Sequence, residues 1–120
     1  YEIMLWMNYT GSSDGSGNVK PIAAQYDSSG KAVPAFTNVS VGGSTWNVFK
    51  GSNGSNAVFS FLRTSKTNSA TVDVKAIFNW IKSQGWFGDI TMGNLQYGFE
   101  ITSTSGSETF TVNSYSVTSN

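Results

Sequence analysis

Two glutamates stand in strand-like segments that otherwise suit a protein core. Glu2 lies in the run Tyr1–Met7, and Glu100 lies in the run Leu95–Thr102. Burying a carboxylate costs roughly several kcal/mol unless the carboxylate is partnered, so a charge at such a position needs a reason. Paired carboxylates catalyse glycoside hydrolysis, where a separation of about 5–5.5 Å gives retention of configuration and one of about 6.5–9.5 Å gives inversion. The pattern therefore makes Glu2 and Glu100 a candidate catalytic pair.

The other acidic residues have simpler explanations. Asp14, Asp27 and Asp89 sit in or beside Gly/Ser turns, where an Asp side chain bonds to its own backbone. Asp73 stands at the start of a helical pattern, where a negative charge is favoured. Glu108 follows a Ser/Gly loop and is interpreted as a solvated charge at a strand edge. None of these residues needs a catalytic role.

The neighbours of the two glutamates suit the binding of a sugar. Side chains alternate between the two faces of a strand, so the even-numbered residues of each segment share a face with its glutamate. These faces offer an aromatic platform, an amide and a glycine that leaves room for a sugar ring, whereas the odd-numbered residues are apolar and belong in the core. The predicted substrate-binding residues are Met4, Trp6, Gln96 and Gly98.

Other interpretations of the same pattern remain open. A glutamate in a strand can simply pair with Lys or Arg across the sheet, and Trp6 could be an ordinary core residue. A non-catalytic carbohydrate-binding module of β-sandwich fold would present the same strands without turnover. A structural wall protein, or a wall protein that an inhibitor recognises, would also present these strands without hydrolysing glucan.

Composition excludes several classes of partner. The 120 residues fit one domain at most, with a formal net charge of zero and only 12% charged residues. Nucleic-acid binding needs clustered Lys and Arg, and the seven basic residues are scattered. There is neither a polybasic membrane patch nor an apolar run of about 18 residues that could span a bilayer. We therefore expect no nucleic acid and no membrane as partner.

The residue types that are absent limit the chemistry. The chain has no Cys and no His, which excludes disulfides, a Ser-His-Asp triad and any His-ligated metal within it. No metal or cofactor is expected. Ser, Thr, Asn and Gly carry the polarity beside 14% aromatic residues, which is typical of a secreted, extracellular β-protein that handles sugars. N-glycosylation acceptor patterns at Asn8, Asn38 and Asn53 agree with secretion.

Alternating apolar and polar residues, bounded by turns rich in Gly, Ser and Asn, predict short strands. Pro21 interrupts one of them, and a Gly42-Gly43 turn joins two others. The predicted strands are Tyr1–Met7, Val19–Gln25, Phe36–Val41, Ser44–Lys50, Ala57–Arg63, Leu95–Thr102 and Thr109–Val117.

One segment has a helical period. Four of its apolar residues fall at positions i, i+3, i+4 and i+7, which places them on one face of a helix spanning roughly 72–83. Ser69 or Thr71 would cap its start, with Asp73 in the first turn. Gly85 would end it. We expect this helix to pack on a sheet by its apolar stripe.

The elements together predict an all-β fold, a two-sheet antiparallel sandwich with one α-helix. A sandwich of this kind often runs to about 200–250 residues. The chain opens directly inside a predicted strand, and half a sandwich would expose apolar faces and unpaired edges. We therefore expect a second chain, or a missing segment that supplies an N-terminal half, to complete the sheets.

The segments that carry the two glutamates resemble motifs of glycoside hydrolase family 12. Tyr1–Trp6 resembles the family's E-[IL]-M-[ILV]-W strand, whose Glu is the nucleophile, and Gln96–Glu100 resembles its Q-x-G-x-E segment, whose Glu is the general acid/base. Between them, Gly42–Val48 and Lys50–Asn56 look like its G-G-x-x-W strand and G-x-N-G turn. The segments that follow in the family's order are Ser60–Leu62, Val74–Phe78 and Phe110–Val117.

This resemblance implies a β-jelly-roll of two sheets with a concave cleft, in which residues 1–120 form the C-terminal part of a single glycoside hydrolase domain. It implies endo-hydrolysis, with retention, of β-1,4 linkages in plant cell-wall glucans of the cellulose, mixed-linkage or xyloglucan type. Glu2 would attack the anomeric carbon while Glu100 protonates the leaving oxygen, and Glu100 would then activate water.

The resemblance also assigns roles around this pair. Met4 would pack near the reacting sugar, Trp6 would line the cleft, and Gln96 would hold Glu100 or a sugar hydroxyl. The segment Asn8–Thr37 is longer than in many family members and would reshape one rim of the cleft. The family's N-terminal half supplies further aromatic subsites and an Asp that supports the nucleophile, so the chain alone is expected to be inactive.

Overall fold

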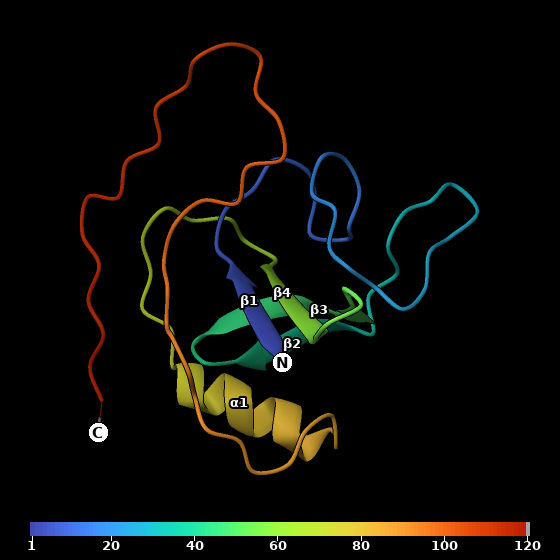
Figure 1. The fold of residues 1–120 in the computed structure, drawn as a ribbon, viewed down its shortest axis with the longest axis vertical. Helices are drawn as coiled ribbons and strands as arrows, with labels where there is room; N and C mark the ends of the chain where they lie inside the picture. Colours follow the sequence, from blue (N-terminus) through green and yellow to red (C-terminus); the bar gives the residue numbers. More distant parts are fainter. Residues whose placement is uncertain (120) are drawn as a thin grey trace. The chain divides into compact units, whose positions relative to one another are not determined.

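The computed structural model describes residues 1–119. The chain divides into a first unit, Tyr1–Gly88, and a second unit that begins at Asp89. All helices and strands of the described residues belong to the first unit (Figure 1). In chain order they are β1 (Glu2–Trp6), β2 (Phe36–Val41), β3 (Ser44–Ser52), β4 (Ala57–Arg63) and α1 (Val74–Ser83).

The four strands form one mixed sheet in the order β1-β4-β3-β2. The β2–β3 and β3–β4 pairs are antiparallel, but β1 pairs with β4 in parallel, from Glu2 opposite Val58 to Trp6 opposite Leu62. Parallel neighbours need a crossover connection. Here residues 7–56, which include β2 and β3, form that connection. The sheet therefore differs in one pair from the purely antiparallel arrangement that the sequence predicts.

The turn between β2 and β3 is a tight two-residue loop at Gly42 and Gly43. Their φ angles are 66° and 90°, and positive φ at both central residues is typical of the type I′ turn that suits a β-hairpin. A Cβ added at Gly42 would lie 2.9 Å from the carbonyl oxygen of Asp73. The Gly42 carbonyl in turn accepts a hydrogen bond from the Asp73 amide at 3.0 Å. This glycine therefore lets the start of α1 sit directly on the hairpin.

The helix is where the sequence predicts it, but its cap differs. Asp73 is the N-cap, and its side chain accepts a hydrogen bond from the Ala76 amide at 3.0 Å. The predicted caps, Ser69 and Thr71, are therefore wrong. Asp73 has an extended backbone and reaches a free amide of the first turn, which is what an N-cap requires. Gly85, with φ 76°, follows the end of the helix as expected.

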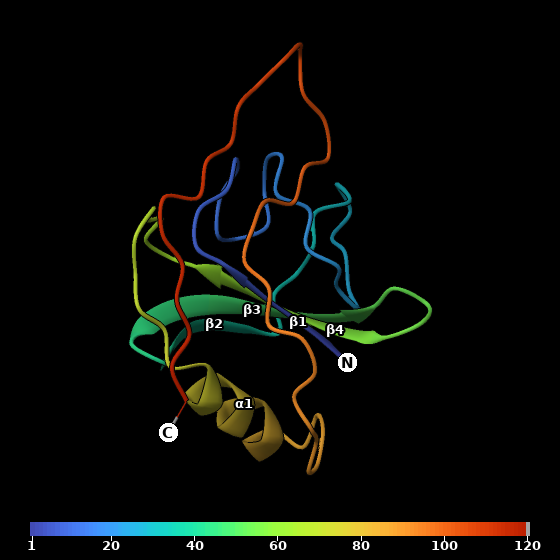
Figure 2. The same cartoon turned by 60° about the vertical axis from the view of Figure 1, so that its left-hand side comes forward.

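One face of the sheet packs against α1 and forms the larger apolar core (Figure 2). Ile3 and Leu5 of β1, and Met7 directly after it, pack half-buried against this core, which confirms the predicted alternation along this segment. The buried members of this first cluster are Trp46, Val48, Phe59, Phe61, Ile77, Ile81 and Phe87.

Truncation of Ile81 to Ala should lower the free energy of unfolding of the first unit by about 2–5 kcal/mol, because the side chain is fully buried and its removal leaves a cavity. Urea titration followed by tryptophan fluorescence measures the change. The matched control is Asn79→Ala, an exposed position on the same helix, which should shift the free energy by no more than about 0.5 kcal/mol. Equal losses in the two variants would contradict this packing.

The segment between β1 and β2 covers the opposite face of the sheet (Figures 1 and 2). No strand forms over Val19–Gln25, so that prediction is wrong. Pro21 has no amide hydrogen to give to a ladder, and only Ala24 donates to β3, to the Lys50 carbonyl at 2.7 Å. Residues Val19–Gln25 are therefore held on the sheet mainly by packing. The buried members of this second cluster are Val19, Ala23, Ala32, Phe49 and Leu62.

The second unit contains neither helix nor strand within residues 89–119, so the predicted strands Leu95–Thr102 and Thr109–Val117 are not formed. Tyr97 stacks on Tyr115 with ring centroids 5.3 Å apart, yet both rings remain about half exposed. A strand needs a partner for its backbone groups and a covered apolar face, and this unit supplies neither from its own residues. The all-β class with one helix is confirmed, while the second sheet stays a prediction.

Two further features concern the described part of the chain. Within residues 1–119 no helix has both the length and the apolar character needed to cross a membrane. The same residues hold no group of three or more His, Cys, Asp or Glu side chains that could bind a metal ion.

Candidate functional site

The strand β1 places Glu2 on the sheet face that looks away from α1. The odd-numbered residues of β1 pack against the helix side, so Glu2, Met4 and Trp6 point to the other side. All three side chains are half-buried. The structure therefore brings these three predicted site residues together on one face, in the order that the sequence predicts.

The turn between β3 and β4 reaches the Glu2 carboxylate. Because β1 runs parallel to β4 with Glu2 opposite Val58, the turn that precedes β4 lies beside the start of β1. Asn53 Nδ2 donates to Glu2 Oε2 at 3.3 Å, and the amino group of Tyr1 donates to Asn56 Oδ1 at 3.5 Å. No sequence motif predicts a role for Asn53 at this site. Its Asn-Gly turn is visible in the sequence, but its closeness to Glu2 depends on the parallel pairing of two distant strands.

Trp6 belongs partly to the core. Its ring packs against the second cluster, beside Leu62, its register partner on β4. Its indole Nε1 is buried and has no hydrogen-bond partner among the described residues, which is uncommon for a buried Trp. Met4, two residues before Trp6 on β1, lies opposite Ser60 of β4. The role of Trp6 and Met4 in substrate binding stays a prediction.

Side-chain hydrogen bonds fasten the covering segment to the sheet. Tyr9 donates its hydroxyl to the Arg63 carbonyl at 2.6 Å, and Asn47 Nδ2 donates to the Ser13 carbonyl at 2.8 Å. Burial raises the pKa of the Tyr9 hydroxyl, and a hydrogen bond with Ser13 opposes this rise. The segment therefore packs on the same sheet face as Glu2, over β3 and β4, where the sequence predicts a reshaped rim.

The loop around Asp14 predicts a pH dependence. Hydrogen bonds from the Ser16 hydroxyl and amide, at 2.6 and 2.9 Å, together with the nearby Lys31 ammonium, lower the pKa of Asp14 from 3.8 to about 2. A lowered pKa means that the folded state favours the carboxylate. Its stabilisation is therefore fully present above pH 3.8 and is lost as the pH falls towards about 2.

We therefore expect the melting temperatures of the wild-type chain and of Asp14→Asn to converge as the pH falls through this window. The effect should be small, because the Asp14 side chain is 55% exposed and solvent screens its interactions. Thermal melts over a pH series measure the convergence. A difference that stays constant from neutral pH down to pH 2 would contradict the assignment.

The remaining predicted site residues, Gln96, Gly98 and Glu100, lie together in the second unit, and all three are exposed. Glu2 belongs to the first unit and Glu100 to the second, so the two glutamates are described separately. The pairing of the two glutamates stays a prediction.

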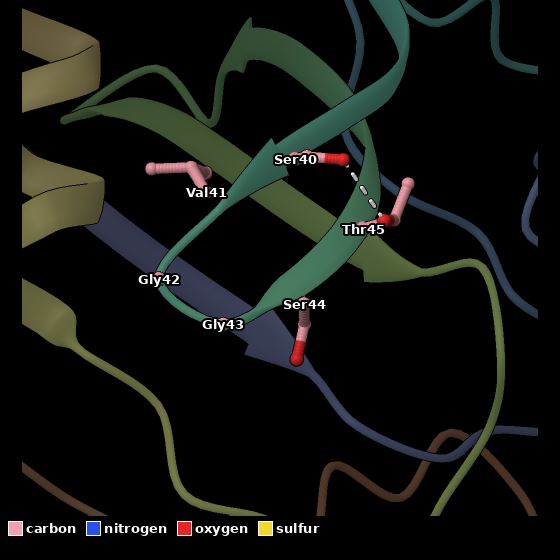
Figure 3. A pocket seen from close by; sticks show the side chains of 6 residues that line it. All are labelled: Ser40, Val41, Gly42, Gly43, Ser44 and Thr45. Atoms are coloured by element: carbon pink, nitrogen blue, oxygen red, sulfur yellow. Dashed lines mark hydrogen bonds between the residues drawn. The ribbon is translucent and has the colours of Figure 1, made fainter.

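A shallow surface depression lies at the β2–β3 turn (Figure 3). Ser40 and Thr45 face each other across it, with their hydroxyl oxygens 3.1 Å apart. It contains no ionisable side chain and none of the predicted site residues, so it offers no catalytic chemistry. Its lining residues are Ser40, Val41, Gly42, Gly43, Ser44 and Thr45.

Curated relatives of this chain are glucanases. It is 36% identical over 118 residues to xyloglucan-specific endo-β-1,4-glucanase A of Emericella nidulans, covering 98% of this chain and 44% of that protein. It is 30% identical over 107 residues to endoglucanase S of Pectobacterium parmentieri, covering 83% of this chain and 34% of that protein. The chain thus spans less than half the length of these relatives.

A solved structure and a family model agree with these relatives. The structure is the xyloglucanase domain of NopAA, a type three effector from Sinorhizobium fredii, in complex with cellobiose. It is 65% identical, with a TM-score of 0.70 over 72% of this chain and 40% of that one. The model of glycosyl hydrolase family 12 matches residues 1–120. Since the match includes both glutamate segments and the whole four-stranded sheet, the chain belongs to glycosyl hydrolase family 12.

Proposed function

We propose that this chain carries both catalytic carboxylates of a retaining endo-β-1,4-glucanase, with Glu2 as nucleophile and Glu100 as general acid/base. The observation that carries the proposal is the position of Glu2, a carboxylate in an otherwise apolar strand, on the face turned away from the core helix and beside an amide donor. The family match over residues 1–120 supports the role of Glu100 as general acid/base.

The proposed reaction has two steps. Glu2 attacks the anomeric carbon while Glu100 gives its proton to the leaving glycosidic oxygen, which forms a glycosyl ester on Glu2 and releases the first sugar product. Glu100, now ionised, takes a proton from water, and the water oxygen attacks the same carbon and frees Glu2. Two inversions give net retention, which requires the carboxyl groups to approach to about 5–5.5 Å.

The proposed substrate is the β-1,4-glucan backbone, and among its forms we place xyloglucan first. Relatives that match over 98% of this chain are named xyloglucan-specific, and the similar solved domain is a xyloglucanase that holds cellobiose. Cellulose-type and mixed-linkage glucans share this backbone. Initial rates on tamarind xyloglucan, barley β-glucan and carboxymethylcellulose rank the three substrates.

We also propose that activity needs an N-terminal segment, because the relatives are more than twice as long as this chain and the second unit does not cover its apolar side chains. The chain joined to an N-terminal segment that restores the relatives' length is termed the full-length enzyme here. The purified 120-residue chain should release no reducing ends from barley β-glucan, whereas the full-length enzyme should. Hydrolysis by the isolated chain would overturn the requirement, and an inactive full-length enzyme would count against the hydrolase itself.

A non-catalytic carbohydrate-binding module stays the alternative. It predicts that glucan binding survives substitution of Glu2 or Glu100 by Gln and that no variant hydrolyses glucan. Secretion also stays part of the proposal, since composition alone supports it.

A further inference from the structure

The turn residue Asn53 has a fixed amide orientation. Its Oδ1 accepts hydrogen bonds from the backbone amides of Ser55 at 2.9 Å and of Asn56 at 2.7 Å. Backbone amides only donate, so the oxygen of the side-chain amide must face them and the nitrogen must face away. That nitrogen is the group that donates to the Glu2 carboxylate at 3.3 Å.

The residue that follows makes this amide chemically labile. Asn53-Gly54 is the single Asn-Gly pair in the sequence, and both residues are exposed. Gly54 has a φ of 91°, and a Cβ added there would meet no atom within 4 Å, so the turn around Gly54 is open on its side-chain side. The Gly54 amide donates to Ser52 Oγ at 3.1 Å, which gives the departing proton an acceptor. The two hydrogen bonds to Asn53 Oδ1 polarise the side-chain carbonyl and make its carbon more electrophilic.

We propose that Asn53 is a site of spontaneous deamidation, and that its conversion to an acid disables the Glu2 carboxylate. The Gly54 nitrogen attacks the Asn53 side-chain carbonyl carbon and forms a five-membered imide. The bond to Nδ2 breaks, and Nδ2 leaves as ammonia with the proton lost by Gly54. Water then opens the imide at either carbonyl and leaves aspartate or isoaspartate. One water is consumed and one ammonia is released, with no change of oxidation state.

The product changes the surroundings of Glu2 in two ways. The Glu2 carboxylate loses the amide donor that now lies 3.3 Å from its Oε2, and in the aspartate product an ionised oxygen takes the place of Nδ2. Like charges at this range repel each other. The consequence for catalysis rests on the proposed function, whereas the deamidation and the charge coupling do not.

Peptide mapping tests the covalent step on the chain as it exists. After incubation at mildly alkaline pH, the Asn53 peptide should show the mass change of amide-to-acid conversion and a positive isoaspartate assay. It should do so ahead of the Asn68-Ser69 and Asn113-Ser114 peptides, which are internal comparators of exposed Asn-Ser type. An Asn53 peptide that stays unchanged while another asparagine converts would overturn the proposal.

A double-mutant cycle tests the coupling without any activity measurement. At neutral pH, Asn53→Asp should lower the melting temperature of the chain, and the drop should shrink when Glu2→Gln is also present, because the repulsion is then gone. Asn56→Asp is the matched control, since this neighbouring Asn contacts the Tyr1 amino group and not Glu2. An equal drop for Asn53→Asp in both backgrounds would show that the two positions are not coupled and would overturn the proposal.

In the full-length enzyme, kcat should fall in proportion to the fraction of Asn53 converted. Asn53→Asp should lower it by about tenfold to a hundredfold, the factor that loss of one hydrogen bond to a charged group carries. Asn56→Asp should keep wild-type kcat. A fully deamidated enzyme with wild-type kcat would overturn the functional part. If no form hydrolyses glucan, the proposed function fails, while the mapping and the cycle still decide the inference.

Discussion

Replacing Glu2 by Gln in the full-length enzyme should lower kcat on xyloglucan by about four to six orders of magnitude, the loss seen when a covalent nucleophile is removed. The substitution keeps the size of the side chain and its place on β1, so the sheet should be unaffected. Its amide oxygen can still accept the hydrogen bond from Asn53. What disappears is the negative charge that attacks the anomeric carbon.

The control for this variant is Glu108→Gln, which changes an exposed glutamate that has no proposed role. It should retain wild-type kcat, and near-ultraviolet circular dichroism should be the same for both variants. Comparable activity of Glu2→Gln and Glu108→Gln would remove Glu2 from the mechanism.

Replacing Glu100 by Gln should lower kcat by about 10²–10⁴-fold, the usual contribution of general acid/base catalysis. The loss should depend on the leaving group. An aryl glucoside with an acidic phenol needs little protonation, so its first step should be nearly normal and the glycosyl-enzyme should accumulate. Stopped-flow measurement should therefore show a burst of phenol. Equal losses on natural and activated substrates, without a burst, would contradict the acid role of Glu100.

Small nucleophiles separate the two roles further. With Glu100→Ala, added azide should attack the glycosyl-enzyme from the face that water uses and give a β-glycosyl azide. With Glu2→Ala, azide should occupy the place of the missing carboxylate and give an α-glycosyl azide. The configuration of the product, read by proton NMR, thus assigns each residue independently of rates. An α-glycosyl azide from Glu100→Ala and a β-glycosyl azide from Glu2→Ala would mean that the roles of the two residues are exchanged.

Much of the first unit could be predicted from the sequence, because its signals are local. The alternation along β1 correctly divides its residues between two faces, and the Gly42-Gly43 pair correctly marks a hairpin. The helical period also holds, although Asp73 rather than Ser69 or Thr71 is the cap. In each case short-range periodicity or turn chemistry determines the outcome.

The features that the sequence analysis missed depend on long-range contacts. Nothing local indicates that β1 pairs in parallel with β4, and only this pairing brings Asn53 to Glu2. The strand predicted at Val19–Gln25 fails because Pro21 cannot continue a ladder and packing holds the segment instead. Trp6 is shared between the candidate site and the second cluster because the segment between β1 and β2 folds over its face.

The second unit shows the limit of local patterns most clearly. Its residues alternate as a strand should, yet no strand forms within 89–119, since β-structure requires a partner for its backbone groups. Phe99 and Phe110 contact each other with ring centroids 5.1 Å apart and remain about half exposed. In physical terms, the apolar side chains of this unit lack a covering layer among the described residues.

Trapping the covalent intermediate tests the central proposal most directly. A 2-deoxy-2-fluoro cellobioside with an activated leaving group should inactivate the full-length enzyme, and peptide mass spectrometry should find the sugar on the peptide that contains Glu2, bound as an ester to its carboxylate. One label per molecule should account for the full loss of turnover. A label on Glu100 or on any other residue, or an active enzyme that forms no ester and yields products of inverted configuration, would contradict the assignment of Glu2 as nucleophile.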